Sequence, residues 1–442
     1  MGQGRRRHRL AQRIGIPPGS KYPTPPGHAR GRCYLYRHPA FLPSKCWVCI
    51  HADRISRFGR FFCSARAAPE KPPGCARSCR TRADKLLLDR ELLRLMRDPQ
   101  LFRQEIESLP SRSWVVIDET QKLPALMNEI HDALTSAPLR WRFALTGSSA
   151  RRLRRDDVNL LAGRVVMRHI LPLTMTELAD VPATDDLLRF GLLPMVRSAR
   201  GAAARIDLLE AYAETYFAQE IRAEALVRSL ESFTRFLEVA ALANAQVTNV
   251  SALARDAALA RDAAVARPTI QGYFEVLTDT LLGTWLPAWR PRAKVKEVQH
   301  PKFYLFDPGV VRALTRRLRE PLDPAERGTL LETLVLHELR AQIAYSDCGG
   351  DLSYYRTPSG TEVDFIWKRA SHAAGIEVKA SSRWRPEFSR ALTELHATGI
   401  IQSAWGVYLG EQPLQVGPIR VLPLGAFQRE LASGRVLKPK KR

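Results

Sequence analysis

The chain has 442 residues, of which 45% are hydrophobic, an ordinary fraction for a globular protein of two or three domains. It contains no run of 18 apolar residues, so we expect no transmembrane helix. The net charge of +23 is uneven, because residues 1–83 hold 18 Lys and Arg against only Asp53 and Glu70, a net +16 that leaves +7 for the other 359 residues. Residues 84–442 are therefore only mildly basic, and the charge of the whole chain does not indicate that they bind nucleic acid.

Residues 1–83 show no sustained period of two or 3.6 and are rich in Arg, Pro, Cys, Gly and Ser. Three interpretations stay open for them. The segment is a disordered basic tail that binds nucleic acid or anionic surfaces, or it holds zinc through Cys46-x-x-Cys49 and Cys75-x-x-x-Cys79, or it is translated out of frame. Beyond it only Cys348 remains, so we expect the body to be cytoplasmic.

The out-of-frame interpretation predicts what the gene contains between the codons of Phe62 and Pro72. With a suitable choice of synonymous codons, reading from the third base of the Phe62 codon spells Leu-Leu-Gly-Pro-Arg-Gly-Thr-Gly-Lys-Thr. That string contains G-x-x-x-x-G-K-[ST], the loop whose backbone N–H groups hold phosphates in P-loop proteins. Several bases are open to synonymous choice, so the nucleotide sequence decides whether the hypothesis holds.

From about Ala83 the hydrophobic pattern becomes regular. Residues 86–88 predict the end of a strand, and residues 102–109 predict a helix after a break at residues 98–99. Next comes an apolar strand over residues 114–117 that ends in the adjacent acids Asp118 and Glu119. This is typical of a Walker B strand, whose acids handle Mg²⁺ and the attacking water in P-loop ATPases. No segment from residue 1 to residue 113 fits the phosphate loop that should precede it.

The elements after this strand continue the alternation of strands and helices. A helix is predicted over residues 124–134, and a strand over residues 141–149 ends in small polar residues. Such alternation predicts a doubly wound parallel sheet. Because ligands bind at the carboxyl ends of parallel strands, we expect Asp118, Glu119, Thr146 and Ser148 at one edge of that sheet.

Four motifs together carry a resemblance to a known family. They are residues 115–124 (VVIDETQKLP), 145–153 (LTGSSARRL), 160–164 (LLAGR) and 171–178 (LPLTMTEL). With them, residues 84–425 resemble a prokaryotic ATPase family of the AAA superfamily that carries a C-terminal restriction-endonuclease-like, PD-(D/E)xK, domain of unknown function.

The resemblance implies ATP and Mg²⁺ as ligands and gives four residues roles in hydrolysis. Asp118 is implied as the acid on the Mg²⁺ side, and Glu119 as the base that orients water. Thr146 is implied as a sensor at the strand tip, and Arg164 as a stabiliser of developing charge. The chain departs from the family in lacking the Walker A loop, and we therefore predict impaired nucleotide binding.

The middle of the chain predicts a winged helix. Three short helices precede a β-rich stretch over residues 282–306, and the recognition helix is expected over residues 269–280. Arg267 and Gln271 suit contacts with DNA bases, and basic residues of the expected wing suit phosphates. Those wing residues are Arg290, Arg292, Lys294 and Lys296. The alternative is a winged helix that only packs domains together. The second helix contains a direct repeat, residues 253–258 followed by residues 259–264, which we expect to lengthen it or form a loop.

The end of the chain contains an acidic constellation with a lysine. Glu332 lies on the apolar face of a predicted helix, and Asp364 lies in a strand that follows a turn. Glu377 and Lys379 are two residues apart, so both point to one face of the next strand. A helical Glu followed by Asp-x₁₂-Glu-x-Lys is the arrangement of restriction-endonuclease-like folds. The carboxylates would hold a divalent metal that activates water, with Lys379 assisting, although such a domain can also only bind.

The sequence therefore predicts an α/β chain of five parts. They are a disordered, out-of-frame segment over residues 1–83, a truncated P-loop parallel-sheet ATPase core over 84–185, a helical linker over 186–230, a winged-helix-like part over 231–312 and a nuclease-like domain over 313–442. The predicted function is that of a cytoplasmic ATP-binding protein with impaired nucleotide binding and no membrane contact. The alternative is a DNA-binding or metal-dependent nuclease-like protein that uses the C-terminal domain.

Overall fold

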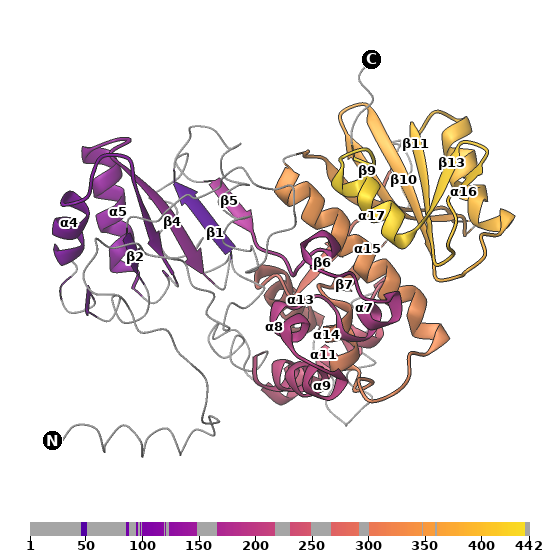
Figure 1. Cartoon of the computed structure of the whole chain (residues 1–442), viewed down its shortest axis with the longest axis horizontal. Helices are drawn as coiled ribbons and strands as arrows, with labels where there is room; N and C mark the ends of the chain where they lie inside the picture. The colour runs from indigo at the N-terminus through magenta and orange to yellow at the C-terminus, as the bar shows by residue number, and fades with distance from the viewer. Residues whose placement is uncertain are drawn as a thin grey trace. The chain divides into compact units, whose positions relative to one another are not determined.

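Figure 1 shows the computed structural model of the chain. The structure describes residues 46–50, 85–87, 94–95, 98, 100–118, 120, 123–147, 166–216, 230–248, 267–290, 300–346, 348–358 and 360–437. Within residues 1–83 it describes only β1 (Cys46–Ile50), a strand where we expected disordered chain. The local sequence Cys-Trp-Val-Cys-Ile is rich in aromatic and β-branched residues, which favour strands.

The first part of the described chain is a five-stranded sheet with two helices. Its elements are β1, β2 (Lys85–Leu87), α4 (Gln100–Glu107), β3 (Ser113–Ile117), α5 (Ala125–Ser136), β4 (Trp141–Gly147) and β5 (Val166–His169). The strand order is β2-β3-β4-β1-β5. The strands and helices predicted between residues 86 and 149 are therefore confirmed within a few residues of their expected bounds.

The core of this sheet lies between β3, β4 and the two helices. Val115 and Ile117 of β3 share one buried cluster with Phe102 of α4 and Ile130 of α5, while Val116 is buried outside that cluster. A strand buried on both faces reads as a continuous apolar run rather than an alternating one, which is typical of parallel sheets. This burial explains why residues 115–117 are all apolar.

One strand of the sheet runs against the others. β2, β3 and β4 are mutually parallel, and β1 pairs antiparallel with both β4 and β5, so β5 runs in the direction of β4. Cys46 lies opposite Gly147 and Ile50 lies opposite Phe143. β1 therefore ends at the amino end of β4. The expected parallel sheet is confirmed for four strands, with β1 as the exception.

The middle part is helical, with one hairpin. Its elements are η4 (Met175–Glu177), α7 (Thr184–Phe190), α8 (Pro194–Ser198), α9 (Ala202–Ala211), the π-helical turn η5 (Tyr212–Tyr216), α11 (Leu230–Leu242), α13 (Arg267–Asp279), β6 (Gly283–Leu286), β7 (Lys302–Leu305) and α14 (Pro308–Leu314). α11, α13 and the antiparallel β6–β7 pair lie where the winged helix was predicted. Its expected second helix, with the repeated hexapeptide, lies outside the described residues, so the winged helix stays a prediction.

Aromatic rings hold these elements together. Phe236 of α11 packs edge to face on Phe274 of α13, with ring centroids 4.8 Å apart, and also contacts Tyr273. Phe274 packs in turn on Trp285 of β6 and Phe303 of β7. Such ring pairs stabilise the fold beyond the free energy that burying the rings contributes. The face of α13 that was predicted to recognise DNA is therefore opposite a face buried in the core.

A buried aspartate joins the middle helices. Asp307 caps the amino end of α14 and accepts hydrogen bonds from the backbone N–H of Val310, at 3.1 Å, and from that of Leu192, at 2.5 Å. Its carboxylate lies against Gly191, where a Cβ would be only 1.8 Å from Oδ1. Gly191 also has a φ of +64°, which favours glycine. The turn after α7 can therefore approach α14 only with glycine at this position.

The end part is an α/β domain. Its elements are α15 (Pro324–Ser346), β8 (Asp351–Arg356), β9 (Glu362–Arg369), β10 (His372–Lys379), α16 (Pro386–Ala397), β11 (Ser403–Tyr408), β12 (Leu414–Val416), β13 (Ile419–Pro423) and α17 (Leu424–Ala432). The six strands have the order β12-β13-β11-β10-β9-β8. The β10–β11 and β11–β13 pairs are parallel, and the other pairs are antiparallel.

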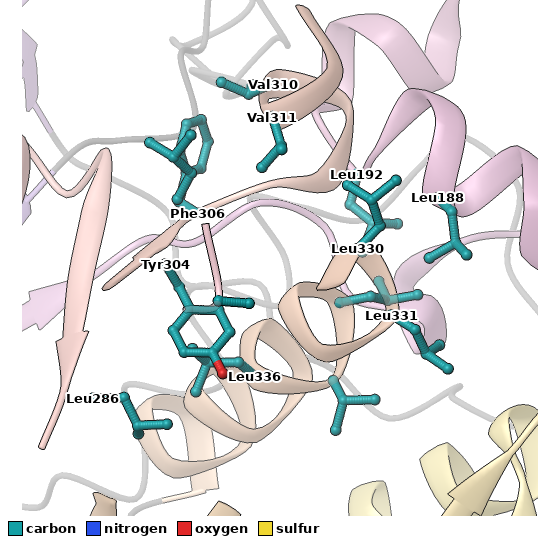
Figure 2. Close-up of a cluster of buried hydrophobic side chains, with 14 of the residues drawn as sticks. Leu188, Leu192, Leu286, Tyr304, Phe306, Val310, Val311, Leu330, Leu331 and Leu336 are labelled. Carbon is teal, nitrogen blue, oxygen red and sulfur yellow. The ribbon is translucent and has the colours of Figure 1, made fainter. Parts of the chain in front are cut away.

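One hydrophobic core continues from the middle part into the end part. Leu286 of β6, Tyr304 of β7 and Val310 of α14 belong to the same buried cluster as Leu331 and Leu336 of α15, and Figure 2 shows these side chains around α15. The core therefore crosses residues 312–313, where we predicted a domain boundary.

None of the helices in the described part of the chain combines the length and hydrophobicity that crossing a bilayer requires.

Candidate functional site

The carboxyl edge of the five-stranded sheet holds the first candidate site. Asp118 directly follows β3, and Thr146 is the second-last residue of the neighbouring strand β4. The Thr146 hydroxyl donates a hydrogen bond to the Asp118 carboxylate, and the Thr120 hydroxyl donates to the Thr146 backbone oxygen at 3.0 Å. Thr146 and Thr120 are buried. Parallel pairing of β3 and β4 brings these strand ends together, as the sequence predicted.

Other residues predicted for this edge cannot be placed. Glu119, Ser148 and Arg164 lie outside the described residues. β1 is the only described strand before β2, and its last residue, Ile50, lies opposite Phe143 at the other end of the sheet. Among the described residues, the edge therefore has an acid and a hydroxyl but no phosphate loop.

The second candidate site joins the four residues predicted in the end part. Asp364 lies on β9, while Glu377 and Lys379 lie on the neighbouring strand β10. Lys379 Nζ is 2.5 Å from Glu377 Oε1 and 3.8 Å from Asp364 Oδ2. The Val378 N–H donates to the same Asp364 oxygen at 2.8 Å. Asp364 and Glu377 are buried. Lys379, the last residue of β10, therefore lies beside a buried pair of carboxylates.

Glu332 reaches the site from α15 and brings two partners that sequence reasoning missed. Tyr304 donates its hydroxyl to Glu332 Oε2 at 3.0 Å, and Lys302 Nζ lies 3.6 Å from that oxygen. Lys302 Nζ is also 2.6 Å from Glu362 Oε1. Both partners come from β7, a short apolar strand that begins with lysine. A lysine in such a strand was the one available signal, because a buried lysine needs an acidic partner.

The electrostatics of this cluster are those of crowded carboxylates. Burial, and secondarily Asp364, raises the pKa of Glu332 to about 7. The same two causes raise the pKa of Glu377 well above its usual range. Burial lowers the pKa of Lys302 and Lys379, but the surrounding carboxylates outweigh it and raise both. The cluster therefore favours added positive charge.

Glu377 shows where such charge is lacking. Its Oε1 pairs with Lys379, but its Oε2 has no hydrogen-bond partner. The side chain is only 7% exposed, and Oε2 itself is buried. A buried carboxylate oxygen without a partner is costly, and oxygen donors of this kind suit Mg²⁺ or Mn²⁺. Within the described ranges, no three His, Cys, Asp or Glu side chains are already gathered to hold a metal ion.

The predicted DNA-binding face is only partly described. Arg267 and Gln271 are exposed and one helical turn apart on α13, with Glu275 exposed one turn further along the same helix. Arg290 follows β6, whereas Arg292, Lys294 and Lys296 lie outside the described residues. DNA contact at this helix therefore stays a prediction.

Comparison with known families divides the chain into three consecutive stretches. Residues 79–179 match the AAA domain, residues 182–320 match a domain of unknown function (DUF8612), and residues 327–427 match another domain of unknown function (DUF4143). The first match contains the edge with Asp118 and Thr146 and supports a P-loop ATPase of the AAA type for this part of the chain. The other two families have no assigned function and therefore do not indicate an activity for residues 182–320 and 327–427.

The matching curated relatives are uncharacterized proteins of Mycobacterium bovis and Mycobacterium tuberculosis. Each is 27% identical over 300 residues, which are 67% of this chain and 63% of the relative. The chain thus spans less than two thirds of their length. Among solved structures, a Walker-type ATPase of Pyrococcus abyssi aligns with 59% of this chain and 75% of its own, at 19% identity and a TM-score of 0.33.

Proposed function

We propose that this chain is an AAA-type ATPase relative whose own nucleotide binding is impaired. The observation that carries the proposal is the Asp118–Thr146 hydrogen bond at the carboxyl ends of two adjacent parallel strands, where α/β sheets bind ligands. The edge is assembled, but the sequence contains no G-x-x-x-x-G-K-[ST] loop to hold the phosphates. Without that loop, most contacts to the β- and γ-phosphates are missing.

The residues of this edge have complementary roles in the proposal. Asp118 offers carboxylate oxygens of the kind that Mg²⁺ prefers, and Thr146 holds that carboxylate in place. Glu119 would orient the attacking water, and Arg164 would stabilise charge on the transferred phosphoryl group. Mg²⁺ would neutralise the phosphate oxygens. In the chain as written, these groups lack a correctly held substrate.

The test compares the chain as written with a frame-restored version, in which the codons of residues 62–72 are read in the shifted frame and then returned to the present one. Titration with a fluorescent ATP analogue and Mg²⁺ should show saturable binding only for the restored version, at a dissociation constant of about 1–100 μM, the lower part of the usual range of enzyme affinities. In the restored version, Asp118→Ala should abolish hydrolysis. ATP binding and turnover by the chain as written would contradict the proposal.

A second function is proposed for the end part, namely metal-dependent cleavage or binding of DNA. It is supported by the pairing of Asp364 and Glu377 with Lys379, by the electrostatic repulsion between Glu332 and Asp364, and by the partnerless oxygen of Glu377. Asp364 and Glu377 would hold the metal, with Glu332 as a further ligand. A metal held there would supply an activated water and stabilise a phosphodiester transition state. Lys379 would stabilise charge at the same place.

Cleavage of plasmid DNA in the presence of Mn²⁺ or Mg²⁺ tests this second function. Asp364→Ala should abolish cleavage, because it removes one carboxylate and the acceptor of the Val378 N–H. Asp351→Ala is the matched control, since Asp351 is exposed at the start of β8 and should leave the rate unchanged. Cleavage that persists in Asp364→Ala would show that the activity does not come from this site.

A further inference from the structure

Lys302 enters the carboxylate cluster from outside the end part. It begins β7, within the stretch that matches DUF8612, whereas Glu332 and Glu362 belong to the stretch that matches DUF4143. Its side chain is only 5% exposed. Burying a lysine to this degree is unfavourable unless the ammonium group is paired, and both acidic partners come from the following domain.

The Lys302 ammonium group holds two carboxylates. It lies 2.6 Å from Glu362 Oε1 and 3.6 Å from Glu332 Oε2, and it sits over the Tyr354 ring at 5.4 Å from the centroid. Glu332 Oε2 also accepts the Tyr304 hydroxyl. That oxygen therefore already has two partners, both from β7.

The other half of the cluster has one cation for two carboxylates. Asp364 and Glu377 share Lys379, and Glu377 Oε2 has no hydrogen-bond partner. The structure thus divides the three acids of the expected metal site. Glu377 retains an oxygen without a hydrogen-bond partner, whereas Glu332 is paired with Lys302.

We propose that Lys302 is a built-in cation that competes with a divalent metal for Glu332, so that the middle part of the chain controls metal occupancy of the end-part cluster. The proposal rests on the second function proposed above. A metal ion next to the Lys302 ammonium group would be repelled by it. To bind Glu332 Oε2, it would also have to displace Tyr304 and Lys302 from that oxygen. Moving β7, or removing the charge of Lys302, should relieve both obstacles.

The experiment measures Mn²⁺ binding to the full chain, using the signal of free Mn²⁺ in electron paramagnetic resonance. Lys302→Met keeps the length of the side chain and removes its charge, so it should lower the Mn²⁺ dissociation constant at least about tenfold, equivalent to about 1.4 kcal/mol. Lys302→Gln, a neutral polar variant, should act in the same direction if Lys302→Met folds poorly. Lys302→Arg retains the charge and should bind Mn²⁺ as weakly as the unmodified chain.

Two controls assign the effect to this cluster. Lys368→Met removes an exposed lysine of β9 and should leave the dissociation constant unchanged. Glu377→Gln, introduced together with Lys302→Met, should weaken binding again, because it removes a carboxylate from the site. If Glu377→Gln has no effect, Mn²⁺ binds elsewhere and the proposal is wrong.

The outcomes separate this proposal from the function on which it rests. Mn²⁺ binding that depends on Glu377 but is the same with and without Lys302 overturns the competition alone. Absence of Mn²⁺ binding in every variant overturns the metal site itself, and the competition with it. Tighter binding in both neutral variants of Lys302, lost with Glu377→Gln, is the result that we expect.

Discussion

The five-stranded sheet and the end domain place their polar residues in different ways. In the sheet, Asp118 and Thr146 follow neighbouring parallel strands and meet because those strands end at the same edge. In the end domain, the acidic cluster is drawn from a helix and two strands, with Lys302 added from a strand of the middle part. The comparison shows that a site at strand ends needs only the strand order, whereas a buried cluster needs the packing of the whole domain.

The two regions also differ in what they lack. The sheet edge lacks a phosphate loop, which is a matter of sequence, since no segment of the chain has the required glycines and lysine. The end-domain cluster has all its predicted residues but lacks a partner for one oxygen of Glu377. We expect substitutions in the hydrophobic core to lower the free energy of unfolding more than substitutions at the sheet edge do.

The largest effect is expected at Phe236, which is 1% exposed among the aromatic rings of the middle part. Phe236→Ala should lower the free energy of unfolding by about 3–5 kcal/mol through lost burial and a cavity. Because Phe236 shares one hydrophobic cluster with Ile376 of β10, amide hydrogens of β10 should also exchange faster. Urea denaturation and hydrogen exchange measure the two effects.

The matched control for Phe236 lies on the same helix. Leu242 is 57% exposed at the end of α11, so Leu242→Ala should change the free energy of unfolding by less than about 0.5 kcal/mol. Unchanged exchange at β10 in Phe236→Ala would contradict a common core and would show that the end domain is stable by itself.

A pH-dependent effect is expected at Glu338, which is buried on α15 and accepts the Met175 N–H at 2.7 Å. Burial raises its pKa to about 7. A carboxyl group whose pKa is higher in the folded chain favours folding fully below its unfolded pKa, and this contribution is lost as the pH rises through about 7. The loss should be on the order of 3 kcal/mol. Unfolding measured between about pH 4 and pH 9 checks it.

Glu338→Gln isolates this contribution, because the amide oxygen can still accept the Met175 N–H but does not titrate. The variant should show a smaller fall in stability between about pH 5 and pH 7, because the contribution of Glu338 is removed while those of Glu332 and Glu377 remain. Glu394→Gln changes an exposed acid of α16 and should keep that fall. An identical pH profile for Glu338→Gln and the unmodified chain would mean that other groups cause the pH dependence.

The smallest effect is expected at the sheet edge. Thr146→Val removes the hydroxyl that donates to Asp118 and should lower the free energy of unfolding by about 1.5–3 kcal/mol, the usual range for a hydrogen bond to a charged group. In the frame-restored version it should also reduce ATP turnover. Thr393→Val, on the exposed side of α16, is the control. A loss as large as that of Phe236→Ala would remove the distinction between a local edge and a globally packed cluster.

Much of the sheet and part of each site could be predicted from local pattern. The apolar run of β3, the amphipathic helix α5 and the strand β4 follow from hydrophobic periodicity, and the meeting of Asp118 and Thr146 follows from parallel strand order. Glu377 and Lys379 share a face because side chains alternate along a strand. These inferences succeed because each depends on residues close in sequence or on a general rule of sheet topology.

Other features were decided by tertiary structure alone. The antiparallel direction of β1 depends on its pairing with β4, about 95 residues later in the chain. Lys302 became part of the acidic cluster only when β7 packed against α15 and β9, which bring Glu332 and Glu362 to it. The sequence by itself determined which residues carry charge and which faces are apolar. Only the folded chain decided which charges share one buried space, because that depends on contacts between elements distant in sequence.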